Sequence, residues 1–144
     1  MAIRGGYRPH ILRIDLREET VVKDPLPSEE VLRKYVGGTG LGLYYLLRDA
    51  PQQAEATDPD APLIIMLGPL TGTPAVNSSD WTTICFNLSI PYSAGVGHGH
   101  GFWGAFLKHA GHEGIILTGR AEKPSYLWID DDRVEIRDAT HLWG

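Results

Sequence analysis

The amino-acid sequence predicts an α+β fold of mostly antiparallel sheets with a few short helices. Apolar and polar residues alternate with a period of two in several short runs, which is typical of half-buried strands. These runs come in pairs joined by short charged turns, as in β-hairpins. The helical segments are short and follow the hairpins irregularly, whereas a parallel α/β sheet needs strands and helices in regular alternation.

The chain is expected to begin with a hairpin. In residues 10–16, HILRIDL, apolar side chains at every second position fall on one face of a strand. Residues 20–24, TVVKD, are expected to pair with this strand. Pro25 and Pro27 then end the hairpin, because proline has no backbone N–H to donate.

Two short helices are expected to follow the hairpin. Ser28 can cap a helix over residues 29–36, and the glycine pair at 37–38 supplies its stop signal. A second helix over residues 41–49 carries leucines at helical spacing and ends before Pro51.

The second half of the chain is expected to add strands, one helix and a closing hairpin. In chain order the predicted elements are a strand at 62–67, a loop at 68–80, a strand at 81–88, a helix at 102–110, a strand at 114–119, and a hairpin of 125–129 with 133–137. The hairpins within 12–24 and 127–138 share an apolar-x-Ile-Asp pattern and a charged turn, which leaves open whether they are duplicates.

The composition fits one domain and excludes several classes of protein. With 144 residues, of which 42% are hydrophobic, the chain can bury a core of its own. A net charge of −5 and the lack of a basic cluster argue against nucleic acid as a partner. The longest apolar run, at 62–67, is too short to cross a membrane, and no apolar signal segment stands at the N-terminus.

The single cysteine, Cys85, limits the metal and redox chemistry of the chain. One thiol can form neither a disulfide framework nor a C-x-x-C site, and a reducing, cytoplasmic location is expected. Cys85 falls within a predicted strand, where a buried structural role is expected. Glu113 and the acidic residues 130–132 are expected to be solvated turn charges.

The stretch SAGVGHGHGFWG at residues 93–104 is the strongest candidate for a binding site. Glycines at alternate positions let a rigid ligand approach the main chain, and the helix start that follows offers free N–H groups to a phosphate. Residues 99–104 match the G-x-G-x-x-G spelling, but the apolar strand that a dinucleotide site requires does not directly precede them. The alternative is a flexible connection with two solvated histidines.

A histidine-ligated metal is a second hypothesis for this stretch. His98 and His100 are two residues apart, so on an extended backbone both rings project to one side and can chelate a transition metal. His109 and His112 would complete a four-imidazole site. They lie on either side of a predicted helix end, however, and no acidic or thiol ligand accompanies the first pair, so the sequence disfavours this hypothesis.

Four blocks of sequence, in order, resemble the N-terminal domain of the tungsten-containing aldehyde ferredoxin oxidoreductase family. They are YVGGTGLGLYYLL, LIIMLGPLTGTPA, GFWGAFLKHAGHEGIILTGRAEKPSYLWI and VEIRDATHLWG. The resemblance covers nearly the whole of residues 1–144. It implies an α+β domain of two related, mostly antiparallel sheets that form a saddle-like platform for a bis-molybdopterin cofactor with tungsten or molybdenum.

The resemblance also implies which residues contact this cofactor. The glycine stretch would form part of the cofactor's floor, and the main-chain carbonyl of His98 would bind a magnesium ion that bridges the two pterin phosphates. Gly99, His100 and Gly101 would lie beside it. An arginine usually follows the GPLTGT loop in the family and meets a phosphate, but here the sequence reads NSSDW, and Asp80 would bring a negative charge to that place.

By resemblance, the chain is expected to be the cofactor-binding platform of an oxidoreductase that acts on the aldehyde or oxo group of its donors. Ferredoxin or a similar carrier would accept the electrons, and a 4Fe-4S cluster would be bound by four cysteines in later domains. Residues 1–144 are therefore expected to be inactive alone, to contain no catalytic residue, and to join the other domains in a homo-oligomeric enzyme. The alternative is a stand-alone, non-catalytic binding or assembly module, which Asp80 favours.

Overall fold

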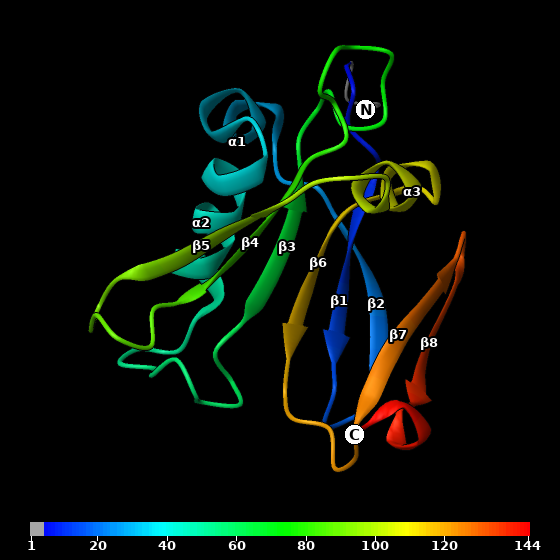
Figure 1. Cartoon of the computed structure of the whole chain (residues 1–144). Helices are drawn as coiled ribbons and strands as arrows, with labels where there is room; N and C mark the ends of the chain where they lie inside the picture. The colour runs from blue at the N-terminus through cyan, green and yellow to red at the C-terminus, as the bar shows by residue number, and fades with distance from the viewer. Residues whose placement is uncertain (1–4) are drawn as a thin grey trace.

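A six-stranded mixed sheet lies at the centre of the structure (Figure 1). The structure is a computed structural model that describes residues 5–144. The strands follow the spatial order β2-β1-β6-β3-β4-β5, and among the described residues β1 and β6 form the one parallel pair of this sheet. In that order the strands span Thr20–Pro25, His10–Asp15, His112–Thr118, Leu63–Leu67, Trp81–Phe86 and Ala94–Gly99.

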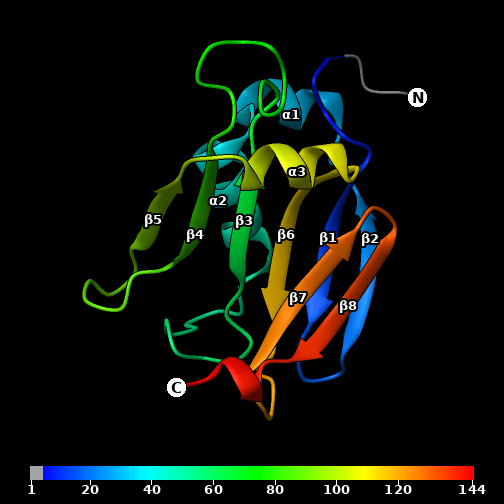
Figure 2. The same cartoon turned by 45° about the vertical axis from the view of Figure 1, so that its right-hand side comes forward.

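Both faces of the central sheet are covered, which makes the structure three-layered (Figure 2). Helices α1 and α2 lie on one face. Helix α3 and the separate two-stranded sheet of β7 and β8 lie on the other. These elements span Glu29–Tyr35, Gly38–Asp49, Trp103–His109, Ser125–Asp130 and Arg133–Asp138, and a short 3₁₀ helix follows at Thr140–Leu142. Within residues 5–144, no helix combines the length and the apolar character that a membrane crossing requires.

The apolar strands owe their composition to this burial on two sides. Ile64 and Met66 of β3 belong to the core beneath α1 and α2. Their neighbours Ile65 and Leu67 point the other way, into the core beneath α3 and the β7–β8 hairpin. A strand buried on both faces has no solvent side for polar residues, and so it appears in the sequence as a continuous apolar run.

The structure confirms the predicted α+β class with mostly antiparallel pairing. The predicted strands and helices lie within a few residues of their expected places. Two elements differ. Helix α2 begins at Gly38 rather than at residue 41, and residues 94–99 of the glycine stretch form a strand that the sequence did not predict. Glycine shows no side-chain alternation, so a glycine-rich strand has no periodic signal to detect.

A buried ion pair joins the end of α3 to the start of β6. The Nζ of Lys108 lies 2.6 Å from both carboxylate oxygens of Glu113, and the two side chains are 4% and 0% exposed. The prediction that Glu113 is a solvated turn charge is therefore wrong. The turn is shorter than expected because β6 already begins at His112, which places Glu113 inside the sheet.

The same pair is tied to two further parts of the chain. Lys108 Nζ also donates to the carbonyl of Gly68 at 3.1 Å, while the backbone N–H of Arg8 donates to Glu113 at 2.7 Å. Arg8 Nε donates in turn to the carbonyl of Lys108 at 2.7 Å. Burial raises the pKa of Glu113 and lowers the pKa of Lys108, and the attraction between the two charges opposes both shifts. The pair thus links the N-terminal segment, the loop after β3, α3 and β6.

Removing one partner of this pair should destabilise the fold strongly. Lys108→Met leaves the Glu113 carboxylate buried without its cation, which is expected to lower the free energy of unfolding by about 3–5 kcal/mol. Adding Glu113→Leu should restore more than half of that loss, because an apolar pair needs no charge compensation. Urea denaturation of both variants measures this.

The exposed pair Arg33–Glu29 supplies the matched control. Arg33→Met is expected to change the free energy of unfolding by less than about 1 kcal/mol, since water screens this pair. A loss in Lys108→Met as small as that in Arg33→Met would contradict the structural role of the buried pair.

Candidate functional site

Three glycine-rich segments from separate parts of the sequence meet at one end of the central sheet. A Cβ atom on Gly37, just before α2, would lie 2.8 Å from the carbonyl oxygen of Leu67 at the end of β3. A Cβ atom on Gly38 would lie 3.4 Å from the hydroxyl oxygen of Thr82 in β4. The same hydroxyl oxygen lies 3.3 Å from Nδ1 of His98 in β5. The start of α2, the loop after β3 and the end of β5 therefore form one surface.

The glycines of β5 make room for the side chains of β4. Trp81 and Thr83 of β4 pair with Gly99 and Gly97. A Cβ on Gly99 would lie 2.1 Å from the Trp81 ring, and a Cβ on Gly97 would lie 2.7 Å from the Thr83 hydroxyl. At Gly95 the nearest atom, Cys85 Sγ, would be 3.5 Å away, which is an ordinary contact. The bare main chain at 97 and 99 thus has a structural cause within the protein.

Gly101 is different from the glycines of the strand. Its φ of +88° is a conformation that residues with a side chain rarely adopt. No described atom lies within 4 Å of the place where its Cβ would be. Of the two glycines expected to lie against a ligand, Gly101 is therefore the one that borders open space.

The main chain of His98 faces the free edge of the sheet. β5 is the last strand in the order, and Asn87 N–H donates to the Ser93 carbonyl at 2.8 Å where the β4–β5 hairpin closes. In an antiparallel ladder, pairs joined by backbone hydrogen bonds alternate with pairs that are not. Counting from the hydrogen-bonded pair Asn87–Ser93, the pair Thr82–His98 is one without backbone hydrogen bonds. The carbonyl and N–H of His98 consequently point away from β4, while its ring contacts Thr82.

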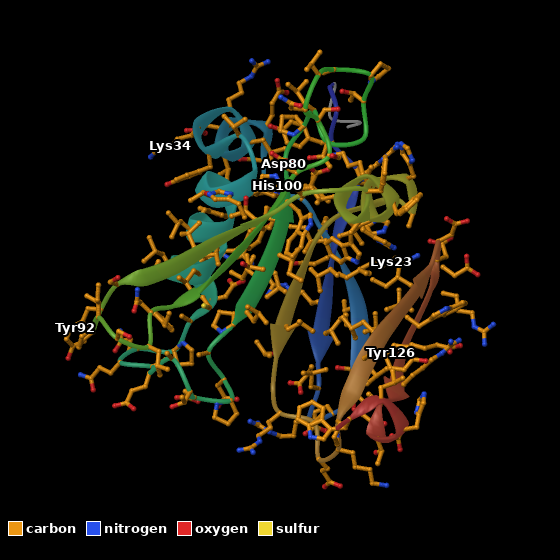
Figure 3. All side chains as sticks on the ribbon, in the orientation of Figure 1. Lys23, Lys34, Asp80, Tyr92, His100 and Tyr126 are labelled. Atoms are coloured by element: carbon orange, nitrogen blue, oxygen red, sulfur yellow. The ribbon has the colours of Figure 1, made fainter. Side chains whose placement is uncertain are left out.

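Asp80 and His100 contact each other beside this edge (Figure 3). His100 Nδ1 lies 2.9 Å from Asp80 Oδ1, and the side chains are 74% and 52% exposed. The main chain of Asp80 is fixed as well, because its carbonyl accepts from the buried hydroxyl of Thr71 at 3.1 Å. Protonation of His100 would therefore neutralise the charge that Asp80 brings to the site.

The four histidines of the metal hypothesis do not come together. His98 contacts Thr82 and His100 contacts Asp80, whereas Nε2 of His109 lies 3.1 Å from the Gly72 carbonyl. His112 bonds to a carbonyl in the β7–β8 turn. Among residues 5–144, no group of three or more His, Cys, Asp or Glu side chains is placed to hold a metal ion.

Sequence reasoning missed two features of this surface. Gly37 and Gly38, interpreted as the end of the first helix, stand at the start of α2, where no side chain of residues 5–144 caps the first turn. The indole Nε1 of Trp81 is buried without a hydrogen-bond partner among the described residues. The rule that drew attention to residues 95–101, glycines at close spacing, also applies to residues 37–42 and would have found the first feature.

An apolar groove lies next to the glycine surface. It has a volume of about 330 Å³ between α3 and β7. Trp103 and Phe106 of α3 line it, with Trp128 of β7 on the other side, and Phe106 remains 68% exposed. The ring of Trp103 lies 5.0 Å from that of Trp81, so the groove and the glycine surface share one wall.

Comparisons with known proteins give consistent results. The family described as aldehyde ferredoxin oxidoreductase, N-terminal domain, matches residues 11–144. The tungsten-containing aldehyde ferredoxin oxidoreductase of Pyrococcus abyssi is 40% identical over 96% of this chain, and an aliphatic sulfonate oxidoreductase, WOR-like subunit, of Pyrococcus furiosus is 41% identical over 96%. The chain spans only 23% and 22% of the lengths of these relatives.

A solved structure is similar over nearly the whole chain. It is the active site complex BamBC of benzoyl coenzyme A reductase in complex with 1,5-dienoyl-CoA, with a TM-score of 0.91 and 30% sequence identity. The similarity covers 97% of this chain and 21% of that one. The similarity is therefore confined to a part of a longer chain.

The packing of β4 against β5 predicts different tolerance at two neighbouring glycines. Gly99→Ala should lower the free energy of unfolding by about 1–3 kcal/mol, because the added methyl group overlaps the Trp81 ring. Gly95→Ala is the matched control in the same strand and should be close to neutral, since its methyl group meets only ordinary contacts. Urea denaturation compares the two, and equal losses would show that the Trp81 contact is not the cause.

Proposed function

This chain belongs to the aldehyde ferredoxin oxidoreductase family, and on that premise we propose that it is the cofactor-binding platform of an oxidoreductase acting on aldehydes. The observation that carries this proposal is the meeting of three glycine-rich segments at one end of the sheet. They leave main-chain groups accessible where a large, flat, anionic cofactor needs close approach and N–H donors.

The proposed ligand is a bis-molybdopterin cofactor with tungsten or molybdenum and a bridging magnesium ion. Gly101 would lie against the cofactor, since nothing within the described residues fills the space beside it. The His98 carbonyl would bind the magnesium ion, because this carbonyl points to the free sheet edge. The cofactor would supply the redox chemistry, and the protein would bind and orient it.

Phosphate groups at this surface would rely on the main chain for compensation of charge. Lys108, the nearest buried cation described above, is already occupied by Glu113. Within the part of the chain that the structure describes, the first turn of α2 has no side-chain cap, so its N–H groups and the positive end of the helix dipole are available to an anion. His100 compensates Asp80 when protonated, which reduces the repulsion that Asp80 would exert on a phosphate.

The substrate would be selected outside this domain. The relatives are named for aldehydes, aliphatic sulfonates and benzoyl coenzyme A. Each of them nevertheless matches almost the whole length of this chain. A shared domain combined with different substrates supports a division of labour. Here the platform binds the cofactor, and the remaining three quarters of such an enzyme would supply the substrate pocket, a 4Fe-4S cluster, the ferredoxin contact and the oligomer interface.

Gly101 and Gly111 provide a matched test of this proposal in the complete enzyme. Both have positive φ, of +88° and +95°, and both have no described atom within 4 Å of the Cβ position. Alanine at either position should therefore cost the fold a similar amount. We expect Gly101→Ala to lower the pterin and tungsten content at limiting cofactor by about 5- to 150-fold, the equivalent of about 1–3 kcal/mol of overpacking, and Gly111→Ala to leave it unchanged.

Metal and pterin analysis of the purified proteins makes this comparison, with urea denaturation to verify that the two variants are equally stable. Full cofactor content in Gly101→Ala would refute contact with the cofactor at this glycine.

His98→Asn tests whether the histidine acts through its main chain. The carbonyl survives the substitution, so magnesium, tungsten and pterin should be retained at near wild-type levels in the complete enzyme. Elemental analysis and pterin fluorescence give the readout. Loss of magnesium with pterin still bound would identify the imidazole, and not the carbonyl, as the ligand.

A further inference from the structure

Two histidines lie side by side on the face of the sheet opposite α1 and α2. His10 begins β1 and His112 begins β6, and the two residues are direct partners in the parallel pairing. Their ring centroids are 5.0 Å apart at an angle of 63°. The His112 residue is fully buried, and the β7–β8 turn at Asp131 and Asp132 covers the pair.

The hydrogen bonding of this pair is incomplete. His112 Nε2 lies 2.9 Å from the carbonyl oxygen of Asp131, and since a carbonyl only accepts, this nitrogen carries the proton. In the neutral ring Nδ1 is then a bare acceptor. Both His112 Nδ1 and His10 Nε2 are buried without a partner among the described residues, and unpaired buried polar atoms are unfavourable.

The β2 strand and the β7–β8 turn contribute the charged and polar groups identified beside the pair. Lys23 from β2 forms an ion pair with Asp132 of the turn, and Asp131 of the same turn accepts from His112. These two contacts attach the turn to the central sheet. A proton added to His10 would meet the positive charge of Lys23 and a second imidazole, with the Asp132 carboxylate as the one anion identified nearby.

We propose that His10 and His112 form an acid-operated release for the β7–β8 turn. With both rings neutral, the turn stays closed over them. Release of the turn exposes the rings to water, which completes the hydrogen bonding of both unpaired nitrogens and solvates an imidazolium. Because β7 forms one wall of the groove beside α3, release loosens that wall. The inference concerns this hairpin and does not depend on the cofactor.

The direction of the pH dependence follows from the closed state. Burial, His112 and Lys23 lower the pKa of His10 below its ordinary value of 6.5, and Asp132 opposes them. The released state therefore binds more protons as pH falls below 6.5, so acid favours release. The Lys23 contact lowers the pKa of Asp132, which keeps this carboxylate charged over the same range.

Amide hydrogen exchange of this 144-residue chain tests the proposal. Protection factors, corrected for the intrinsic pH dependence of exchange, are compared at about pH 7.5 and about pH 5.5. We expect protection of residues 131–134 to fall by up to about tenfold in acid, the limit for one proton over one pH unit below the ordinary His10 pKa. Amides of β3 and β4 should keep their protection.

His10→Gln should remove the acid response at residues 131–134, and His141→Gln, in the exposed C-terminal 3₁₀ helix, is the matched control that should retain it. An equal acid response in His10→Gln and the wild type would overturn the proposal, as would an equal loss of protection throughout the molecule. If His10→Gln does not fold, an NMR titration of the wild-type histidine rings decides. A His10 midpoint at or above 6.5 would refute the mechanism, and a lower midpoint that coincides with release would support it.

Discussion

The buried Lys108–Glu113 pair is the constraint on which the arrangement of the site depends. Through it the last turn of α3, the start of β6, the loop after β3 and the N-terminal segment are fixed to one another. A hydrophobic contact could hold these segments together, but it would not set their register, because apolar contacts are not directional. In this ion pair Lys108 also donates to the Gly68 carbonyl and Glu113 also accepts from the Arg8 amide, so the directions of these bonds restrict how the segments can be arranged.

The glycine-rich part of the surface results from the packing of β5 against β4. β4 places Trp81 and Thr83 on the face where β5 has no side chains, so the glycines at 99 and 97 accommodate their neighbours. Gly101, two residues beyond the strand, lies where the chain turns toward α3 and borders open space. Glycines that make room for a neighbouring side chain and a glycine that borders open space thus lie within a few residues of one another, and sequence spacing does not distinguish them.

The sequence predicted the elements with apolar periodicity, such as the β1–β2 hairpin, and the class of fold. It did not predict β5, because glycine carries no periodic signal. It placed Glu113 in solvent because the Arg8 amide that donates to Glu113, and the Gly68 carbonyl that accepts from its partner Lys108, are far away in the chain. Resemblance to a family indicated His98 and Gly101 as contacts. The direction of the His98 carbonyl, however, depends on which residue pairs of an antiparallel ladder are bonded, and only the three-dimensional register shows this.

The contact between Trp81 and Gly99 also has a consequence for how such domains can change over generations. Any larger residue at position 99 overlaps the indole, so a substitution there lowers the stability of the fold for as long as position 81 carries tryptophan. The effect of a substitution at position 99 therefore depends on which residue already stands at position 81, and so the order of the two changes matters. A lineage that keeps Trp81 is therefore expected to keep Gly99 as well, whereas Gly95 in the same strand is free of this constraint.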